Sequence, residues 1–323
     1  MRRLLALIFA LVLATGLAGC SALFAPIAAQ REARWMAETP PLGQLIPVEG
    51  RQVHVLVAGR ARGTAPDVVL IHGSNGNLRD FTFDLVGRLA GHYRVIAVDR
   101  PGLGWTDSWG EADSDPREQA RILRLAVEAV GVHRPIVVGH SYGGAVAMGW
   151  ALQAPRQTGA VVLISGATHP WEQDLTPWYR FNRTILARPV RAALAAFAPD
   201  RSVRNAIADL FDPEPLPNGY VEHFGAGLSL RRDSQANNVR QVNALLDHVT
   251  EMAPDYATLR LPIEILQGAR DPVIAQETHA DPMVARVSGA RLTVIEDAGH
   301  MLHHTHQDAV VAAIGRATRR SGQ

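Results

Sequence analysis

Ser141 occupies a position where the chain could activate a hydroxyl group for nucleophilic attack. It is the centre of the pentad Gly139-His140-Ser141-Tyr142-Gly143, which follows the apolar run Pro135–Val138 and precedes small residues that favour a helix. A Gly-x-Ser-x-Gly pentad between a strand and a helix predicts a nucleophile elbow, a tight turn that exposes the serine hydroxyl. Gly139 and Gly143 fit this prediction, because a Cβ at either position would collide across the turn. The Tyr142 amide, at the helix N-terminus, would then face negative charge that develops on a substrate.

A histidine and a carboxylate are needed to activate Ser141, because a serine hydroxyl is a poor nucleophile until a base takes its proton. Asp271 comes shortly after the apolar run 263–267, and His300 comes shortly after the run 292–295. Catalytic groups of open α/β sheets gather outside the carboxyl ends of the strands. The sequence therefore predicts that Ser141, Asp271 and His300 meet at that edge as a catalytic triad.

The elements that must position these residues alternate between strand and helix. Continuous apolar runs predict strands buried on both faces of a parallel sheet, and they lie at 68–72, 95–99, 136–139, 161–165, 263–267 and 292–295. Amphipathic segments predict helices at about 78–90, 116–130, 144–153, 276–287 and 307–318. Residues 45–49 and 52–58 predict an antiparallel hairpin around Glu49-Gly50. The predicted fold class is α/β, with a doubly wound and mostly parallel sheet.

One interval breaks this alternation. Residues 167–259 contain no buried-strand run, only helical pieces separated by prolines. So long a connection within a compact core predicts an inserted helical subdomain, here called the cap. The expected organisation is a core of residues 44–166 and 260–323 with a helical lid of residues 167–259.

Several motifs, in chain order, resemble those of the α/β-hydrolase superfamily. Besides the elbow and the helical insertion, they are His72-Gly73-Ser74, the turn Asp99–Trp105, the turn Gly268–Asp271 and the pair Gly299-His300. The matches extend over residues 45–318, and the order Ser, Asp, His along the chain is that of the family. The chain is most similar to the serine esterases and lipases that carry a helical lid. The resemblance implies an oxyanion hole formed by the backbone amides of Ser74 and Tyr142, with His72 and Gly73 as structural parts of the oxyanion loop.

The same resemblance implies a serine hydrolase that cleaves a carboxylic ester or a related acyl bond through an acyl-enzyme. It also admits C–C bond hydrolases, cofactor-free haloperoxidases and lyases of the same fold. A non-catalytic binding or scaffold protein would be expected to show a broken triad, and this triad is complete. The expected substrate is a small ester-like molecule, and no protein partner can be named.

The choice of the acid has alternatives. Some family members carry it after the strand that precedes the lid, but that turn here has no carboxylate, and Asp174 lies further on. Asp297 shares a short loop with His300, so its carboxylate would rarely face the far imidazole nitrogen. Asp271 is therefore the expected acid, and Asp99 is expected to hold its own turn.

The composition excludes several other classes of protein. All 32 basic residues are arginines, which excludes Schiff-base, pyridoxal-phosphate and Walker-type lysine chemistry. A net charge of +1, with both signs interspersed, gives no electrostatic footprint for nucleic acid. Cys20 is the single cysteine, which excludes an intrachain disulfide and a cysteine-based metal site.

A histidine cluster near the C-terminus raises the question of a metal. It comprises His300, His303, His304 and His306. Zinc would need two of these side chains on one helix face and a third ligand from elsewhere. We expect instead a histidine-rich helix start that lines a cleft, so no metal and no other cofactor is predicted.

The N-terminus predicts attachment to a membrane of the cell envelope. Met1-Arg2-Arg3 precedes an apolar run, and Leu17-Ala18-Gly19-Cys20 resembles a bacterial lipoprotein box, in which Cys20 carries the lipid. The alternative is an uncleaved transmembrane anchor, because no charge occurs from Leu4 to Ala29. Either signal, in residues 1–29, would hold the catalytic domain outside the cytoplasm through a polar spacer of residues 30–43.

Overall fold

The computed structural model describes residues 24–172, 176–184 and 187–323. Cys20 and most of the predicted export segment lie outside these residues. Within the described part of the chain, no helix combines the length and the apolar character needed to cross a membrane.

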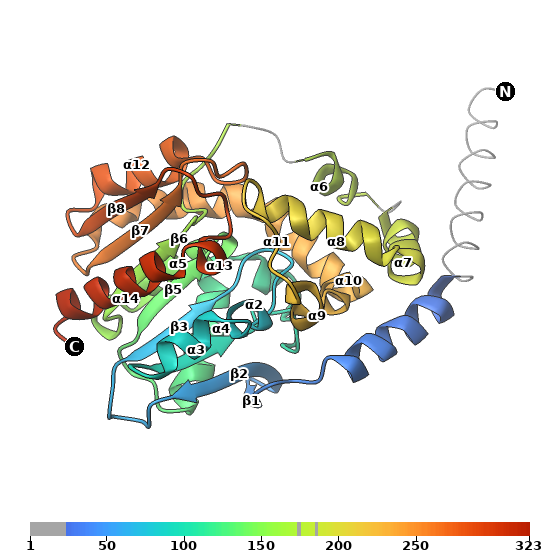
Figure 1. Cartoon of the computed structure of the whole chain (residues 1–323), viewed down its shortest axis with the longest axis horizontal. Coiled ribbons are helices and arrows are strands. Elements are labelled where there is room, and N and C mark those ends of the chain that lie inside the picture. Colours follow the sequence, from blue (N-terminus) through green and yellow to red (C-terminus); the bar gives the residue numbers. More distant parts are fainter. Residues whose placement is uncertain (1–23, 173–175, 185–186) are drawn as a thin grey trace.

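An eight-stranded sheet forms the centre of the molecule (Figure 1), in the order β1-β2-β4-β3-β5-β6-β7-β8. The strands are β1 (Gln44–Val48), β2 (Arg51–Gly59), β3 (Asp67–Ile71), β4 (Arg94–Val98), β5 (Ile136–His140), β6 (Ala160–Ile164), β7 (Ile263–Gly268) and β8 (Ala290–Ile295). β2 pairs antiparallel with β1 and with β4, and all the other pairs are parallel. The predicted mostly parallel sheet with an N-terminal antiparallel hairpin is confirmed. The order reverses at β3, which lies between β4 and β5, and such a reversal opens a crevice at the carboxyl ends of the strands.

The central strands β3 to β6 are almost fully buried because each side of the sheet carries its own core. Val69 and Ile71 pack on one side with α4 (Pro116–Ala129), α5 (Tyr142–Gln153) and α12 (Gln276–Arg286). Val68 and Leu70 pack on the other side with α3 (Leu85–Ala90) and α14 (Gln307–Ser321). Alternate residues of a strand point to opposite faces, so both sets must be apolar when helices cover both faces. The edge strand β8 is predicted to be buried on both faces, but no residue of it is fully buried, because only β7 pairs with it.

The helix predicted at 78–90 is divided into α2 (Arg79–Thr82) and α3. The break falls at Asp84, whose φ of −153° is not helical. Its carboxylate accepts a hydrogen bond of 2.6 Å from the Gln307 side chain. Apolar spacing alone does not reveal this break, because Phe81 and Leu85 both remain buried in one core.

The described cap residues between β6 and β7 are entirely helical or irregular. The cap helices are α6 (Pro177–Phe181), α7 (Ala187–Phe197), α8 (Asp200–Ala208), α9 (Tyr220–Phe224), α10 (Gly227–Leu230) and α11 (Arg232–Met252). Two short 3₁₀ turns, η3 (Asp209–Phe211) and η4 (Ala253–Thr258), also belong to the cap. Figure 1 shows α7 to α10 gathered to the right of the sheet, close to the N-terminal helix.

The remaining short elements lie in the core. They are the 3₁₀ turns η1 (Gly110–Ser114) and η2 (Pro155–Gln157), and α13 (Leu302–Thr305), which precedes α14.

That N-terminal helix, residues 24–38, overlaps the predicted spacer of residues 30–43 and packs on the cap. Trp35 is buried and meets the backbone of Gly227 so closely that a Cβ there would clash with its ring. Glu32 accepts hydrogen bonds from the guanidinium of Arg232, at 2.8 and 2.9 Å. An aromatic side chain and an ion pair thus fasten this helix to α10 and α11.

Candidate active site

Ser141 lies on a sharp turn between β5 and α5. Its φ of 52° is in the left-handed region, which non-glycine residues rarely adopt. A Cβ on Gly139 would lie 2.2 Å from the Gly143 carbonyl oxygen, and one on Gly143 would lie 2.2 Å from that of Ile71. Both contacts are with backbone, which cannot move aside, so the turn requires glycine on either side of the serine.

Asp271 and His300 meet at the carboxyl ends of β7 and β8. The Nδ1 atom of His300 lies 2.8 Å from Oδ2 of Asp271, and both side chains are buried. The other carboxylate oxygen accepts hydrogen bonds from the amides of Val273, at 2.8 Å, and Ile274, at 2.9 Å. Burial raises the pKa of Asp271, but the His300 hydrogen bond, the His300 charge and these two amides together bring it below its ordinary value. An anionic Asp271 holds the proton on Nδ1 of His300 and leaves Nε2 available as a base.

Ser141 and His300 line the same cavity. Asp297, the nearer acid in sequence, has a side chain that is 86% exposed and pairs with Arg270 at 3.4 Å. Asp174 lies outside the described residues. Among the described acids, Asp271 is therefore the one bonded to the His300 imidazole.

Ser74 and Tyr142 also line the cavity, and the described residues offer neither backbone amide a hydrogen-bond partner. Each of these amides shares a peptide group with the carbonyl of the preceding residue, Gly73 or Ser141, and that carbonyl accepts hydrogen bonds on the opposite side of the peptide. Ser141 O accepts from the amides of Gly144, at 2.9 Å, and Ala167, at 3.0 Å. In a planar trans peptide the N–H points opposite to the C=O. Holding the Ser141 carbonyl therefore aims the Tyr142 N–H away from those donors, which is the arrangement that an oxyanion hole requires.

His72 is predicted to be a structural part of the oxyanion loop. Its Nε2 accepts a hydrogen bond of 2.9 Å from the Arg100 amide, so the proton lies on Nδ1, which donates to Gly73 O at 2.9 Å. Burial, and then the charge of Arg100, lower the pKa of His72 to about 4. The neutral ring connects the oxyanion loop to the turn after β4.

Asp99 holds that turn, as expected. Its carboxylate accepts from the amides of Leu78, at 2.6 Å, and Trp105, at 2.7 Å, and it bonds to Nδ1 of His54 at 2.7 Å. These contacts close the glycine-rich turn on itself and join it to β2 and to the start of α2, and none reaches His300.

A second polar cluster lies beside the triad, and sequence reasoning missed its central residue, Asp80 on α2. The Asp80 carboxylate bonds to the Nε2 atoms of His303, at 3.0 Å, and His304, at 2.8 Å, and accepts from the Tyr220 hydroxyl at 2.6 Å. Burial raises the pKa of Asp80, but the two histidines outweigh it and hold that pKa well below its ordinary value. No motif marks Asp80, because only the tertiary fold brings α2 to α13.

Asp80, His303 and His304 place possible metal ligand atoms within 4.8 Å of one another. A metal-bound imidazole almost always donates its other N–H to a partner. The Nδ1 atoms of His303 and His304 are buried and have no partner among the described residues. Hydrogen bonding to Asp80 therefore accounts for the cluster better than metal binding does.

The cavity over Ser141 has a volume of about 780 Å³ and is lined by residues of both core and cap. Its lining is mainly apolar and includes Trp171, Leu194, Phe224, Val242 and Ile274. No arginine occurs among the described lining residues, and the chain has no lysine. The described lining therefore offers mainly apolar contacts and contains no arginine or lysine side chain.

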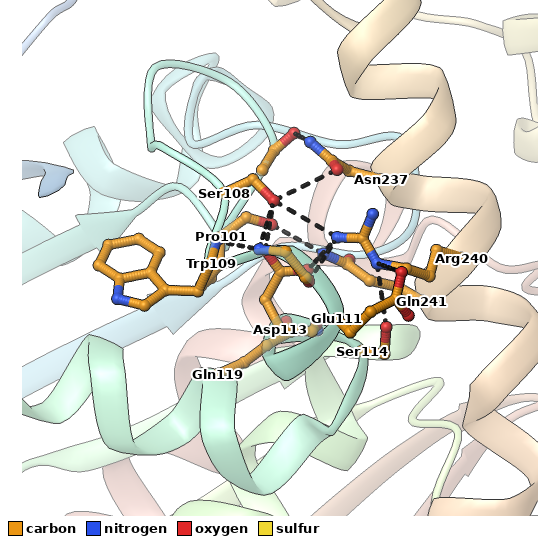
Figure 2. Close-up of polar contacts among 12 residues, drawn as sticks. Pro101, Ser108, Trp109, Glu111, Asp113, Ser114, Gln119, Asn237, Arg240 and Gln241 are labelled. Atoms are coloured by element: carbon orange, nitrogen blue, oxygen red, sulfur yellow. Dashed lines mark hydrogen bonds and ion pairs between the residues drawn. The ribbon is translucent and has the colours of Figure 1, made fainter.

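The long cap helix α11 is fastened to the core beside this cavity. Figure 2 shows Arg240 and Gln241 of α11 reaching the carboxylate of Asp113 in η1, at 2.6 and 3.2 Å. Asp113 is fully buried and also accepts from the Ser108 hydroxyl and the Trp109 amide, each at 2.7 Å. Four donors satisfy this buried carboxylate, so α11 is a fixed wall of the cavity.

A family model described as the alpha/beta hydrolase family matches residues 68–313. The chain belongs to this family. The match covers most of the chain, and the sheet, the elbow and the strand-end loops described above are those of the alpha/beta-hydrolase fold. The predicted superfamily and fold class are thereby confirmed.

Three known proteins illustrate the family's range. The chain is 26% identical over 247 residues to a 2-hydroxy-6-oxononadienedioate/2-hydroxy-6-oxononatrienedioate hydrolase of Escherichia coli K12, covering 75% of this chain and 83% of that protein. A solved membrane phospholipase A, described as a bacterial virulence factor, matches with a TM-score of 0.66 and 20% identity over 97% of this chain and 99% of its own. The esterase EaEST of Exiguobacterium antarcticum matches with a TM-score of 0.67 and 21% identity over 85% of this chain and all (100%) of its own. At these identities, the two structural matches establish the shared fold.

Proposed function

We propose that this alpha/beta hydrolase is a serine esterase that cleaves uncharged, apolar carboxylic esters through an acyl-enzyme. The observation that carries the proposal is the meeting of the Ser141 elbow and the His300–Asp271 pair in one apolar cavity. Nε2 of His300 takes the proton from the Ser141 hydroxyl as its oxygen attacks the ester carbonyl carbon. The amides of Ser74 and Tyr142 donate to the oxyanion that forms.

Collapse of this intermediate expels the alcohol, which takes the proton from His300, and leaves the acyl group on Ser141. Water then attacks the acyl-enzyme, with His300 again acting as base, and the acid is released. Asp271 remains anionic throughout, keeping Nδ1 protonated and stabilising the imidazolium.

The similarity to the Escherichia coli hydrolase raises a second candidate, the hydrolysis of a C–C bond in a dienedioate. Such a substrate carries two carboxylates, and buried carboxylates are normally bound by arginine or another cation. The described lining of this cavity contains no arginine or lysine, and it includes an acidic residue, Asp80. The electrostatics thus favour an uncharged ester over a dicarboxylate.

Two measurements test the proposal. A fluorophosphonate probe should label the wild-type protein at Ser141, because the probe reacts only with an activated serine. A series of p-nitrophenyl esters of increasing acyl length should be hydrolysed, and 2-hydroxy-6-oxononadienedioate should not. Turnover of the dienedioate without turnover of any ester would show that the protein is a C–C bond hydrolase and not an esterase.

We also propose that the catalytic domain is held at a membrane of the cell envelope, through a lipid on Cys20 or an uncleaved apolar run. The lipoprotein box and the charge-free stretch from Leu4 to Ala29 support this proposal. Intact-mass measurement of protein purified from its native membrane distinguishes the two forms. A chain that begins at Cys20 with added acyl mass indicates a lipoprotein, and an unmodified chain that still carries Met1 indicates an anchor. Recovery of the protein from the soluble fraction alone would contradict both.

A further inference from the structure

Arg100, which follows β4 in the glycine-rich turn, is a buried cation without an ion pair among the described residues. It is fully buried, and its Nη1 donates to two neutral amide oxygens, those of Gln119 at 3.1 Å and Gln241 at 3.2 Å. Burial lowers the pKa of Arg100 to about 10, so the guanidinium stays charged at neutral pH. An unpaired buried charge is expensive, and carboxylates in place of the two glutamines would offset it. Packing alone therefore does not explain why a charged residue occupies this site.

The guanidinium contacts the peptide group of one proposed oxyanion donor, Ser74, and the side-chain ring of the residue that supplies the other, Tyr142. Its Nη2 donates to Gly73 O at 3.3 Å, and its central carbon lies 4.0 Å from the centre of the Tyr142 ring. Gly73 O belongs to the same peptide group as the Ser74 N–H. Tyr142 supplies the second amide.

The contact with Gly73 has a directional consequence. Gly73 O accepts from Nδ1 of His72 at 2.9 Å and from the Gly76 amide at 3.3 Å as well as from Arg100. Because the peptide is planar and trans, these donors fix the Ser74 N–H pointing the opposite way. A charged donor on the carbonyl also polarises the peptide, since linked hydrogen bonds in a low-dielectric site strengthen one another. The Ser74 N–H becomes a stronger donor to negative charge.

We infer that Arg100 is a positioning residue of the oxyanion hole, in which it orients and polarises the Gly73–Ser74 peptide. This inference rests on the proposed esterase function. Negative charge develops on the substrate only during the reaction, so Arg100 should stabilise the transition state more than the bound substrate. Its loss should lower kcat and leave KM nearly unchanged.

The test compares Arg100→Met with the wild-type protein on the best p-nitrophenyl ester. Methionine has a similar shape and no charge, and replacement of buried ionic groups by apolar ones is often tolerated. We expect kcat to fall by about 10-fold and KM to stay within about 2-fold, a smaller loss than removal of a direct oxyanion donor causes. The Ki of an alkyl trifluoromethyl ketone, whose adduct with serine carries an oxyanion, should rise by the same factor as kcat/KM falls.

A matched control is available at the opposite end of β4. Arg94 is also buried, pairs with Asp67 at 3.1 Å and donates to Val130 O at 2.6 Å, away from the oxyanion loop. Arg94→Met should lower thermal stability and leave kcat and the ketone Ki within about 2-fold of wild type. Arg100→Lys, which keeps the charge, should recover part of the lost rate.

If Arg100→Met fails to fold, Arg100→Gln takes its place, because the glutamine amide can still bond to Gln119 and Gln241. The expected changes in kcat, KM and the ketone Ki are the same. A folded neutral variant with wild-type kcat, or with reduced kcat but an unchanged ketone Ki, overturns the inference. If the wild-type protein neither hydrolyses esters nor reacts with a fluorophosphonate, it is the esterase function that fails.

Discussion

At the scale of single residues, the site depends on which atom each polar group faces. His300 and Asp271 are 29 positions apart in the chain, and their side chains meet at 2.8 Å. His140, beside the nucleophile, donates from Nε2 to His300 O at 3.2 Å. Burial, and then the neighbouring His303 and His300, hold the pKa of His140 well below its ordinary value, so it stays neutral. It therefore holds the backbone of His300 without adding a charge.

Ser141→Ala and His300→Ala should each reduce turnover by roughly 10³-fold or more with the fold intact, as in measured triads. Each change removes one partner in the proton transfer and no part of the core. Steady-state kinetics together with circular dichroism check this result. A well-folded Ser141→Ala protein that kept most of its activity would exclude the acyl-enzyme mechanism.

Asp271→Asn should be nearly as damaging, by about 10³- to 10⁴-fold in kcat, because an amide cannot hold the His300 proton on Nδ1. Asp297→Asn is the matched control, since Asp297 pairs only with Arg270 at the surface in the structure and should leave kcat unchanged. The kinetics of both variants are measured side by side. A larger loss for Asp297→Asn would show that the acid has been wrongly assigned.

At the scale of elements, the junction of β5 with α5 leaves no room for side chains. Gly144 continues this close contact, since a Cβ there would lie 2.7 Å from the Cα of Gly166 after β6. The helix N-terminus can approach β3 and β6 only because these positions carry hydrogen alone. The elbow motif is local in the sequence, but its glycines are required by close packing against β3 and against the residues that follow β6.

Gly143→Ala should destabilise the protein by about 3 kcal/mol or more, because its Cβ would meet backbone oxygen and the core is already packed. Gly87→Ala is the control, because nothing lies within 4 Å of a Cβ at that position in α3. It should be neutral or stabilising by up to about 1 kcal/mol, since alanine favours a helix. Urea unfolding of the two variants measures the difference. Equal stability would mean that the elbow can relax.

At the scale of the whole molecule, folding buries several neutral histidines. Burial is the largest cause that lowers the pKa to about 4 for each of His72, His169, His279 and His303. They lie on the oxyanion loop, the start of the cap, α12 and α13 respectively. Uncharged imidazoles are therefore buried in several of the segments that surround the cavity.

Stability should consequently fall as the pH drops from about 6.5, the ordinary pKa of histidine, towards 4. In this range the unfolded chain binds protons that the folded histidines exclude, so the free energy of unfolding rises with pH. The stabilisation that these neutral histidines contribute is complete above about pH 6.5. The depressed pKa values of Asp80, Asp99 and Asp271 add a further loss below about pH 4, where unfolded carboxylates become protonated. Urea unfolding at pH 7, 5.5 and 4.5 should show uptake of more than one proton, and a constant free energy would contradict the buried neutral state.

The sequence by itself determines the sheet, the elbow and the edge at which the candidate site forms. Strands covered on both faces must be continuously apolar, and a turn as tight as that at Ser141 must have glycine on either side, so both requirements are visible locally. The division of the helix at Asp84 and the packing of residues 24–38 on the cap are not visible in this way, because they depend on Gln307 and Arg232 far along the chain. The same holds for the partners of Asp80 and for the glutamine partners of Arg100. Residue types and periodicity decide which segments are buried, and only the tertiary structure decides which buried polar groups satisfy one another.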